Sequence, residues 1–548
     1  MDKNNLGIIK DMAKLFSATI LSGLFFTGCV DMDLTPKNQP SEGEVWADAT
    51  MAEQTVTGLY NGLNHLYNDN YNMWFDCFSA VMDRDANWRN FGMLFGNQTT
   101  SGDGPSWIWH DNYKFIIRCN DVIANMPDVV GLPEAKKARL IAEAKFLRSY
   151  WYYELNLLFG GVPYYTEPIK NIEEAKGSRL SMTDLWNELI KDLTDCINEP
   201  NLPDKYNSGD NDYGHITKGA AYALRGKIYL WLENWGAAEA DFKKVGDCGY
   251  RLFTSGANAY KMLFKEVNEQ CDEMIFSVQC IEEDGYWNSK NRGFGNRCTY
   301  GSMWNNYLVN PDFVDTYECA DGSKFDWSKI IPEYYKLTVN ERRVFFLRDN
   351  LTESEIANAN MDYYLPSGNE ARIRKAYEQR DPRLEMSVIT PYATYLGGDG
   401  GADNYFTNRY PFRSQWIETQ NADGTITREA SDLRTDTQAM FYYLNRKFVT
   451  EGVGEGSQKG TGIDMPKIRY ADVLLNLAEA LNEQGKIDEA VTVVNQVRAR
   501  AGAQLLNSNV PTTVMGQADM RERIRNERYW ELLGEDLIYF DELRWKTW

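Results

Sequence analysis

The sequence predicts a mainly α-helical fold, in which tetratricopeptide-like helix pairs carry a large, irregular, loop-rich region with a few short strands. Two observations predict it. Within residues 40–250 and 465–548, apolar side chains recur every three or four positions, as they do along one face of a helix. Between residues 253 and 451 that period is lost, and Gly, Asn, Asp and aromatic residues dominate. Because long loops inside a compact protein are usually functional, we expect ligand contacts in irregular insertions at about 83–110 and 253–451.

The composition restricts the function. The 548 residues carry 79 acidic and 58 basic side chains, for a formal net charge of -21. Nucleic acid and anionic lipid headgroups would both repel such a chain, which excludes a function that depends on a basic surface. Aromatic residues make up 13% of the sequence, including 16 tryptophans. This is more than a core of ordinary composition needs, so part of the aromatic side chains require another explanation.

The N-terminal residues 1–28 differ from all that follows. Lysines precede an apolar run over residues 15–26, which is shorter than the roughly 20 residues that cross a bilayer. Small residues stand directly before Cys29, as in a lipobox. We therefore expect a lipoprotein signal peptide, with Cys29 as the acylated first residue of a single body over residues 29–548. Lipid would then be the membrane attachment.

Four helical segments are expected in the N-terminal half, over residues 51–67, 133–159, 183–197 and 218–245. Pro133 suits a first helical turn, and Gly160 suits the end of the same helix. The last segment is expected to be a helix pair, because small and aromatic residues fall at tetratricopeptide offsets: Gly226, Tyr229, Ala238 and Phe242. Such pairs cannot bury their apolar faces alone, so they must stack on one another.

The middle of the chain predicts a short strand and irregular connections, and the C-terminal part predicts helices. A short apolar run at 274–278 predicts a strand. No CxxC or Cys/His spacing indicates zinc, and we expect buried free thiols with one or two disulfides within residues 271–319. The glycine-rich run 452–462 lacks the Gly-Lys-Ser/Thr of a phosphate loop and is expected to be a connection. Residues 470–501 predict a second helix pair, and 518–533 a further helix.

Five segments occur together in one order: AEAKFLRSYWYYELNLLFGGVP (142–163), GHITKGAAYALRGKIYLW (214–231), RDPRL (380–384), IRYADVLLNLAEALNEQG (468–485) and IRNERYWEL (524–532). With the lipobox, this set resembles the SusD/RagB family of surface lipoproteins that capture nutrients. The resemblance implies four tetratricopeptide-like helix pairs and an outer-membrane location facing the cell exterior. It also implies a SusC-like TonB-dependent transporter as partner. One departure is that Glu535 is followed by Asp536, where members usually read Glu-Gly-x-Arg.

Two stretches mix aromatic side chains with polar ones on loop-like sequence, over residues 83–109 and 286–307. Sugar rings present flat C–H faces that pack on aromatic planes, and their hydroxyl groups need forked donors and acceptors. The expected ligand contacts are Trp88, Trp107, Trp287, Trp304 and Phe294 as aromatic surfaces, with Asp83, Asn288 and Arg292 as polar partners. The alternative is that each tryptophan packs its loop against the scaffold, which is what we expect of Trp109.

Catalysis and cofactor chemistry have little support in the sequence. Acidic residues are so abundant that carboxylate pairs such as Asp83 with Asp85 arise by chance, and no HExxH motif accompanies the three histidines. The carboxylate-rich loops at 210–212 and 399–403 fit no calcium-loop register, so bound calcium is not indicated. The prediction is therefore a non-enzymatic protein without cofactor that binds oligosaccharide and delivers it to the transporter. The alternative is the same architecture with peptide or another nutrient as cargo.

Overall fold

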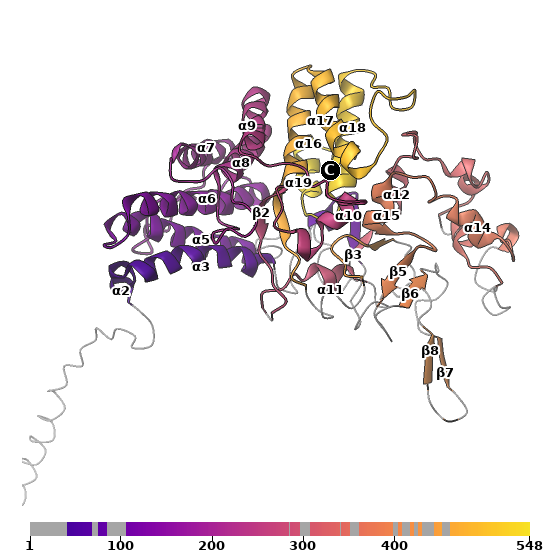
Figure 1. The fold of residues 1–548 in the computed structure, drawn as a ribbon, viewed down its shortest axis with the longest axis horizontal. Helices are drawn as coiled ribbons and strands as arrows, with labels where there is room; N and C mark the ends of the chain where they lie inside the picture. Colours follow the sequence, from indigo (N-terminus) through magenta and orange to yellow (C-terminus); the bar gives the residue numbers. More distant parts are fainter. Residues whose placement is uncertain are drawn as a thin grey trace, which may run out of the picture.

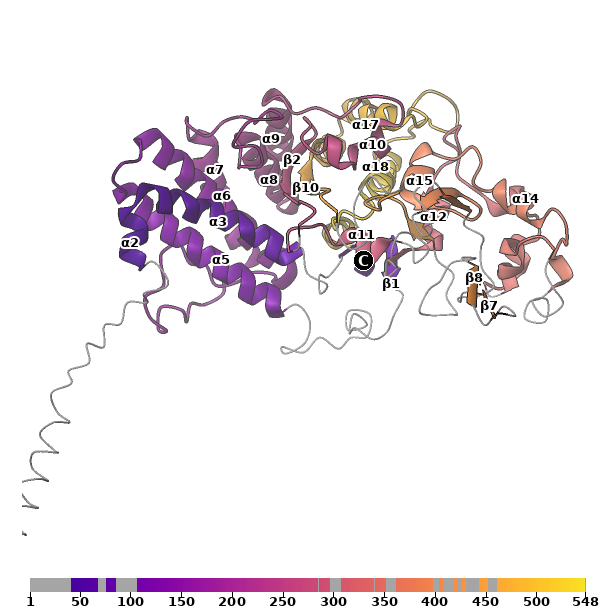
Figure 2. The ribbon, with the colours of Figure 1, turned by 60° about the horizontal axis from the view of Figure 1, so that its bottom comes forward.

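Three parts of the chain follow one another across the structure, which is a computed structural model (Figure 1). The N-terminal helices lie at one end, the C-terminal helices in the middle and most of the irregular region at the other end, and a second view keeps this order (Figure 2). The structure describes residues 41–67, 75–84, 106–283, 285–295, 307–339, 341–350, 361–397, 404–407, 417–420, 423, 426–429, 443–451 and 461–547.

The N-terminal part is a stack of helices in which chain neighbours pack side by side. These helices are α2 (Glu42–Ala47), α3 (Ala49–Tyr67), α5 (Ser106–Asn125), α6 (Glu134–Phe159), α7 (Met182–Asn198), α8 (Lys218–Trp231) and α9 (Trp235–Asp247). Side-chain oxygens cap several of them, since Thr217 accepts the Ala220 N–H at the start of α8. Gly160 ends α6 with a φ of 64°, a conformation that suits glycine.

The α8–α9 pair confirms the tetratricopeptide spacing. A Cβ atom on Gly226 would lie 2.6 Å from the Phe242 ring, so only glycine lets the two helices approach this closely. Asn234 caps α9 by accepting the Ala237 N–H at 3.4 Å. The predicted helical architecture with a loop-rich region is therefore correct.

The C-terminal helices join the N-terminal stack through buried contacts. They are α16 (Tyr470–Glu483), α17 (Ile487–Ala501), α18 (Gln517–Leu532) and α19 (Ile538–Trp545). Helix α16 packs on α9, and the buried Lys227 ammonium of α8 lies 2.6 Å from the Asp472 carboxylate of α16. Gly485 makes the turn between α16 and α17 with a φ of 77°. The helices from both ends of the chain are thus one packed unit.

The irregular region contains short helices and two-stranded ribbons. Its α-helices are α10 (Ala259–Leu263), α11 (Lys290–Phe294), α12 (Pro311–Thr316), α14 (Asn369–Arg374) and α15 (Pro382–Ser387). The 3-10 helices of the chain are η1 (Phe75–Phe78), η2 (Met126–Asp128), η3 (Glu266–Asn268), η4 (Trp327–Lys329), η5 (Tyr334–Lys336), η6 (Glu341–Phe346) and η7 (Met361–Tyr363). Part of this region has a hydrophobic core of its own around Trp327 and Phe345, so it is more than a set of surface loops.

The described strands all pair antiparallel and two by two: β1 (Met82–Arg84) with β3 (Tyr307–Val309), β2 (Met274–Val278) with β10 (Met465–Arg469), β4 (Val388–Ile389) with β9 (Leu444–Asn445), β5 (Thr394–Gly397) with β6 (Asn404–Thr407), and β7 (Ile417–Gln420) with β8 (Ile426–Glu429). The strand predicted at 274–278 is confirmed as β2. Its ribbon with β10 contacts α8 and α16, where the N-terminal and C-terminal helices meet (Figure 2).

A buried ion network joins the segments that carry the family resemblance. Arg469 donates to the carboxylates of Glu531 at 2.7 Å and Glu535 at 2.8 Å. Arg383 pairs with Glu527 at 2.5 Å. All of these side chains are almost completely buried. Buried charges are tolerated only when they are paired and hydrogen-bonded, so these positions fix how the segments meet.

The described cysteines are all free thiols. The disulfides expected within 271–319 therefore do not form among Cys271, Cys280 and Cys319, and Cys298 lies outside the described residues. Cys280 is buried, and its thiol hydrogen bond goes to a backbone carbonyl. In the part of the chain that the structure describes, no helix has both the length and the apolar character that a membrane crossing requires.

Candidate functional site

The two aromatic stretches are joined at their roots, which are the strand β1 at the start of the first stretch and the strand β3 at the end of the second. Strand β1, which contains Asp83, leads into the first stretch, and β3 ends the second. The strands pair with Met82 opposite Val309 and Arg84 opposite Tyr307. Positions far apart in the sequence are therefore brought together, and the start of the first stretch lies beside the end of the second.

Three of the predicted contact residues have side chains that the structure does not describe. Trp88 and Trp304 lie outside the described residues, and Trp107 is described only as part of the α5 backbone. Asp83 is half-buried, and its carbonyl oxygen accepts the Cys77 thiol at 3.8 Å. The remaining candidates lie in the second stretch.

The turn over residues 281–287 presents apolar and aromatic side chains to solvent. Tyr286 is 51% exposed, Ile281 is 50% exposed, and Trp287 is half-buried. The Ile281 N–H donates to the Tyr286 carbonyl at 2.9 Å, and the Asn64 side chain on α3 donates to the Gly285 carbonyl at 3.0 Å. The first bond joins the two ends of the turn, and the second connects it to α3.

Asn288 and Phe294 lie in the interior, beneath this turn. Asn288 donates to the Ile463 carbonyl at 2.9 Å and accepts the Lys290 N–H at 2.8 Å. The Phe294 ring is 1% exposed and meets the Tyr307 ring edge-on at 5.8 Å. The structure thus places these two predicted contacts where they hold α11, while Arg292 on the same helix is half-buried.

Trp109 lies on α5 against other rings. Its indole is 5.2 Å from the Tyr113 ring and meets Phe159 edge-on at 5.1 Å. It is half-buried in this packing. Trp109 therefore has the structural role that the sequence predicts for it.

Two buried charged residues near the site were missed by the sequence reasoning. Asp76 on η1 accepts N–H groups of Gly534 at 2.8 Å and Ile538 at 3.2 Å. The Lys290 ammonium at the start of α11 lies 3.1 Å from the Asp536 carboxylate and also donates to the Gly534 carbonyl. Burial and the neighbouring Asp536 raise the pKa of Asp76 to about 7, while Lys290 acts in the opposite direction. The second stretch, through Lys290, and η1 just before the first stretch, through Asp76, therefore both contact the segment between α18 and α19.

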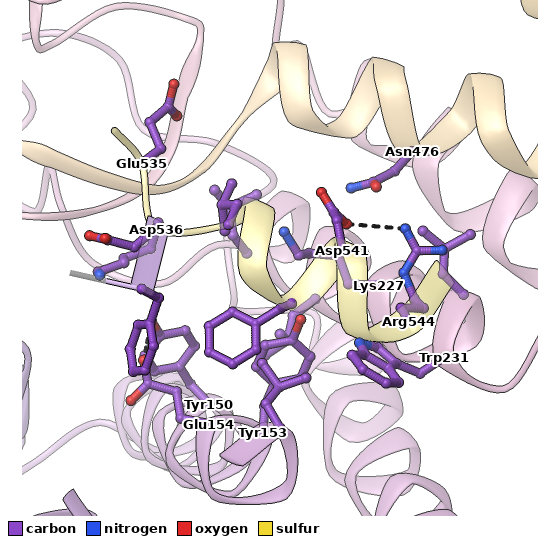
Figure 3. A pocket seen from close by; sticks show the side chains of 18 of the residues that line it. Tyr150, Tyr153, Glu154, Lys227, Trp231, Asn476, Glu535, Asp536, Asp541 and Arg544 are labelled. Atoms are coloured by element: carbon purple, nitrogen blue, oxygen red, sulfur yellow. Dashed lines mark hydrogen bonds and ion pairs between the residues drawn. The ribbon is translucent and has the colours of Figure 1, made fainter. Parts of the chain in front are cut away.

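A cavity of about 80 Å³ lies on the other side of that segment (Figure 3). Aromatic residues line much of it: Phe75, Tyr150, Tyr153, Trp231 and Phe540. The Arg544 guanidinium on its wall pairs with Asp541 at 3.1 Å, and Lys227 pairs with Asp472. Figure 3 shows Asp541 and Arg544 joined above the aromatic rings. The cavity thus combines a mainly apolar surface with several charged groups on its wall.

Two further wall residues of the cavity are charged groups in a buried setting. Burial raises the pKa of the Glu154 carboxyl to about 7, although Lys467 acts against this shift. Burial also lowers the pKa of the Lys467 ammonium to about 8, against the attraction of Asp536 and Glu154. The cavity therefore lies where α6 and α8 of the N-terminal helices meet α19 of the C-terminal helices.

No metal centre is visible among the described residues, where no three His, Cys, Asp or Glu side chains gather suitably. In the carboxylate-rich loop at 210–212, the acidic side chains bind other groups of the protein. Asp212 pairs with Arg139 at 2.6 Å, and Asp210 accepts the Asn207 N–H. The loop at 399–403 lies outside the described residues.

Comparisons with known proteins agree over most of the chain. The model of the SusD family matches residues 272–548, and a model described as starch-binding associating with outer membrane matches residues 33–230. SusD-like protein P25 of Formosa agariphila is 24% identical over 451 residues, which cover 80% of this chain and 69% of that protein.

Solved structures share the fold at low sequence identity. A SusD-like protein from Bacteroides fragilis is 21% identical, with a TM-score of 0.70 over 94% of this chain and 89% of its own. A structure titled laminarin binding SusD-like protein is 20% identical, with a TM-score of 0.62 over 91% of this chain and 92% of its own. Surface glycan-binding protein A from Bacteroides fluxus is 19% identical, with a TM-score of 0.61 over 91% and 90%.

Proposed function

The chain belongs to the SusD family, and on this premise we propose that it is a cell-surface lipoprotein that binds oligosaccharide and delivers it to a transporter. The observation that carries the proposal is the fixed 281–287 turn with its exposed aromatic surface. The names of two related proteins, a laminarin binding SusD-like protein and a surface glycan-binding protein, support the same cargo class.

The 281–287 turn has the properties of a sugar-binding surface. An exposed Tyr286 ring and a half-buried Trp287 ring offer planes for the C–H faces of sugar rings. Since hydrogen bonds already fix the backbone, little conformational entropy is lost when a ligand binds. Arg292 would contact hydroxyl groups, and Asn288 and Phe294 would hold the surface from inside.

The first stretch would complete the same site. We assign ring contacts to Trp88 and Trp107 and a polar contact to Asp83, because the β1–β3 ladder puts the root of this stretch beside the second one. Trp304 would add a further ring. Each stacked ring contributes on the order of 1 kcal/mol beyond its buried area, so the affinity would be modest. Modest affinity suits a protein that must release its ligand again.

The remaining parts of the proposal come from the family resemblance. An acyl group on Cys29 would hold the protein at the outer membrane, facing the cell exterior. The partner would be a SusC-like TonB-dependent transporter beneath it. The protein would act without catalysis or cofactor.

The test is affinity electrophoresis of the purified protein on a panel of polysaccharides. We expect at least one glycan to slow the parent, and Y286A or W287A to lose most of this retardation. Y335A is the matched control, because Tyr335 is 58% exposed in η5, outside both stretches. Unchanged migration of Y286A and W287A on a glycan that binds the parent would contradict the site. Binding of peptides but of no glycan would favour the alternative cargo.

A further inference from the structure

We propose that Lys290 and Asp76 are positioning residues of this glycan site, because they fasten the roots of both aromatic stretches to one turn. The turn comprises residues 533–537, between α18 and α19. The inference rests on the proposed function, since it concerns how the same site keeps its shape. Neither residue needs to touch the ligand.

Asp76 fastens the first stretch. It is completely buried, and its carboxylate accepts the N–H groups of Gly534, Asp536 and Ile538 at 2.8, 3.3 and 3.2 Å. One side chain thus satisfies three donors of a turn that would otherwise be buried without partners. Because η1 ends only a few residues before β1, the position of Asp76 sets where the first stretch begins.

Lys290 fastens the second stretch from the opposite direction. It is 3% exposed, and its ammonium pairs with Asp536 at 3.1 Å and donates to the Gly534 carbonyl. It also lies 4.9 Å from the centre of the Phe448 ring. A buried ammonium must have all of its partners in place, so α11 can move only if the turn moves with it. Lys290 follows the half-buried Trp287 by three residues, which ties that ring to this anchor.

The two fastenings share their partners. Gly534 and Asp536 each contact both Asp76 and Lys290. The roots of the stretches are also joined directly by the β1–β3 ladder. A ligand that contacts rings from both stretches needs them at one spacing, and this shared turn sets that spacing. Loss of one fastening should therefore weaken the other.

Lys447 provides a matched control for Lys290. It is 4% exposed, its ammonium lies 5.5 Å from the centre of the same Phe448 ring, and it donates to the Glu531 carbonyl at 3.1 Å. It also pairs with Glu535, next to the residue that Lys290 binds. Lys447 belongs to neither stretch, so K447M removes a comparable buried ammonium and leaves the roots attached.

The experiment compares the parent with K290M, D76N, K447M and the double variant D76N/K290M. Glycan affinity is measured together with hydrogen exchange of residues 75–84 and 281–295 and with the melting temperature. We expect K290M to weaken glycan binding by about tenfold or more and to speed exchange in residues 281–295, while K447M changes affinity less than about threefold at a similar loss of melting temperature. The double variant should lose less than the product of the single losses.

The outcomes separate this inference from the proposed function. Equal affinity losses in K290M and K447M, or multiplicative losses in the double variant, would overturn the positioning role while glycan binding stands. A parent that binds no glycan would overturn the proposed function. In that case hydrogen exchange still tests the positioning role. Unchanged exchange of residues 75–84 and 281–295 in K290M and D76N would show that Lys290 and Asp76 do not hold these segments in place. If K290M does not fold, D76N carries the test, since it alters the contacts of Asp76 with the turn and leaves Lys290 in place.

Discussion

Replacing Arg469 by methionine is expected to lower the free energy of unfolding by at least about 3–5 kcal/mol, the usual result of removing one partner from a buried ion pair. The Arg469 guanidinium donates to the carboxylates of Glu273 at 2.8 Å, Glu531 at 2.7 Å and Glu535 at 2.8 Å, and to the Glu531 carbonyl at 2.8 Å. These side chains are all almost completely buried. Methionine keeps much of the volume but leaves three carboxylates without their common cation.

The measurement is urea denaturation followed by circular dichroism, with the parent and two further variants. R521M is the control, because the pair of Arg521 with Glu483 is partly exposed and should contribute only about 0–1 kcal/mol. R469K keeps the charge but cannot reproduce the planar fork, so its loss should lie between the two. If R469M unfolds within about 1 kcal/mol of R521M, the reasoning that this network holds the segments together is wrong.

Three other changes test separate parts of the fold. G226V should lower the melting temperature, because the added carbon atoms meet an aromatic ring, whereas G236A should have little effect since nothing lies closer than 4.0 Å. Burial opposes protonation of His215, but the hydrogen bond that the imidazole donates to Glu143, together with the attraction of the Glu143 and Asp212 carboxylates, outweighs burial and raises the pKa of His215. The resulting stability is complete below about pH 6.5 and is lost as the pH rises through the folded pKa, so urea midpoints of H215Q should show a flatter pH dependence there. N369A should cost about 1–3 kcal/mol in thermal or urea unfolding, because the buried Asn369 amide donates to three backbone carbonyls of the second core. An unchanged melting temperature in G226V, an unaltered pH profile in H215Q or parent-like unfolding of N369A would each contradict the corresponding contact.

The helical scaffold could be predicted because its signals are local. The offset between Gly226 and Phe242 is set within one helix pair, and periodic apolar residues mark the long helices. The second core around Trp327 was not predicted, because its short helical turns leave no period in the sequence. Composition alone describes that region only as irregular.

The sequence predicts two aromatic stretches, but it does not tell which of their side chains are buried. Helix α11 is too short for periodicity to tell the inward Asn288 and Phe294 from the half-buried Arg292. Asn64 contacts a residue 221 positions later, and Lys290 contacts one 244 positions later. Such pairs depend on how the whole chain packs, so no local pattern reveals them.

The position of the fastening turn along the chain sets an order of events in folding. Asp76 and Lys290 both contact Gly534, which follows them in the sequence by 458 and 244 residues. During synthesis both residues leave the ribosome long before residues 533–537 follow. Closing such long loops is entropically unfavourable until many other contacts have formed. The contacts of Asp76 and Lys290 with this turn can therefore form only after the segment between α18 and α19 has been synthesised.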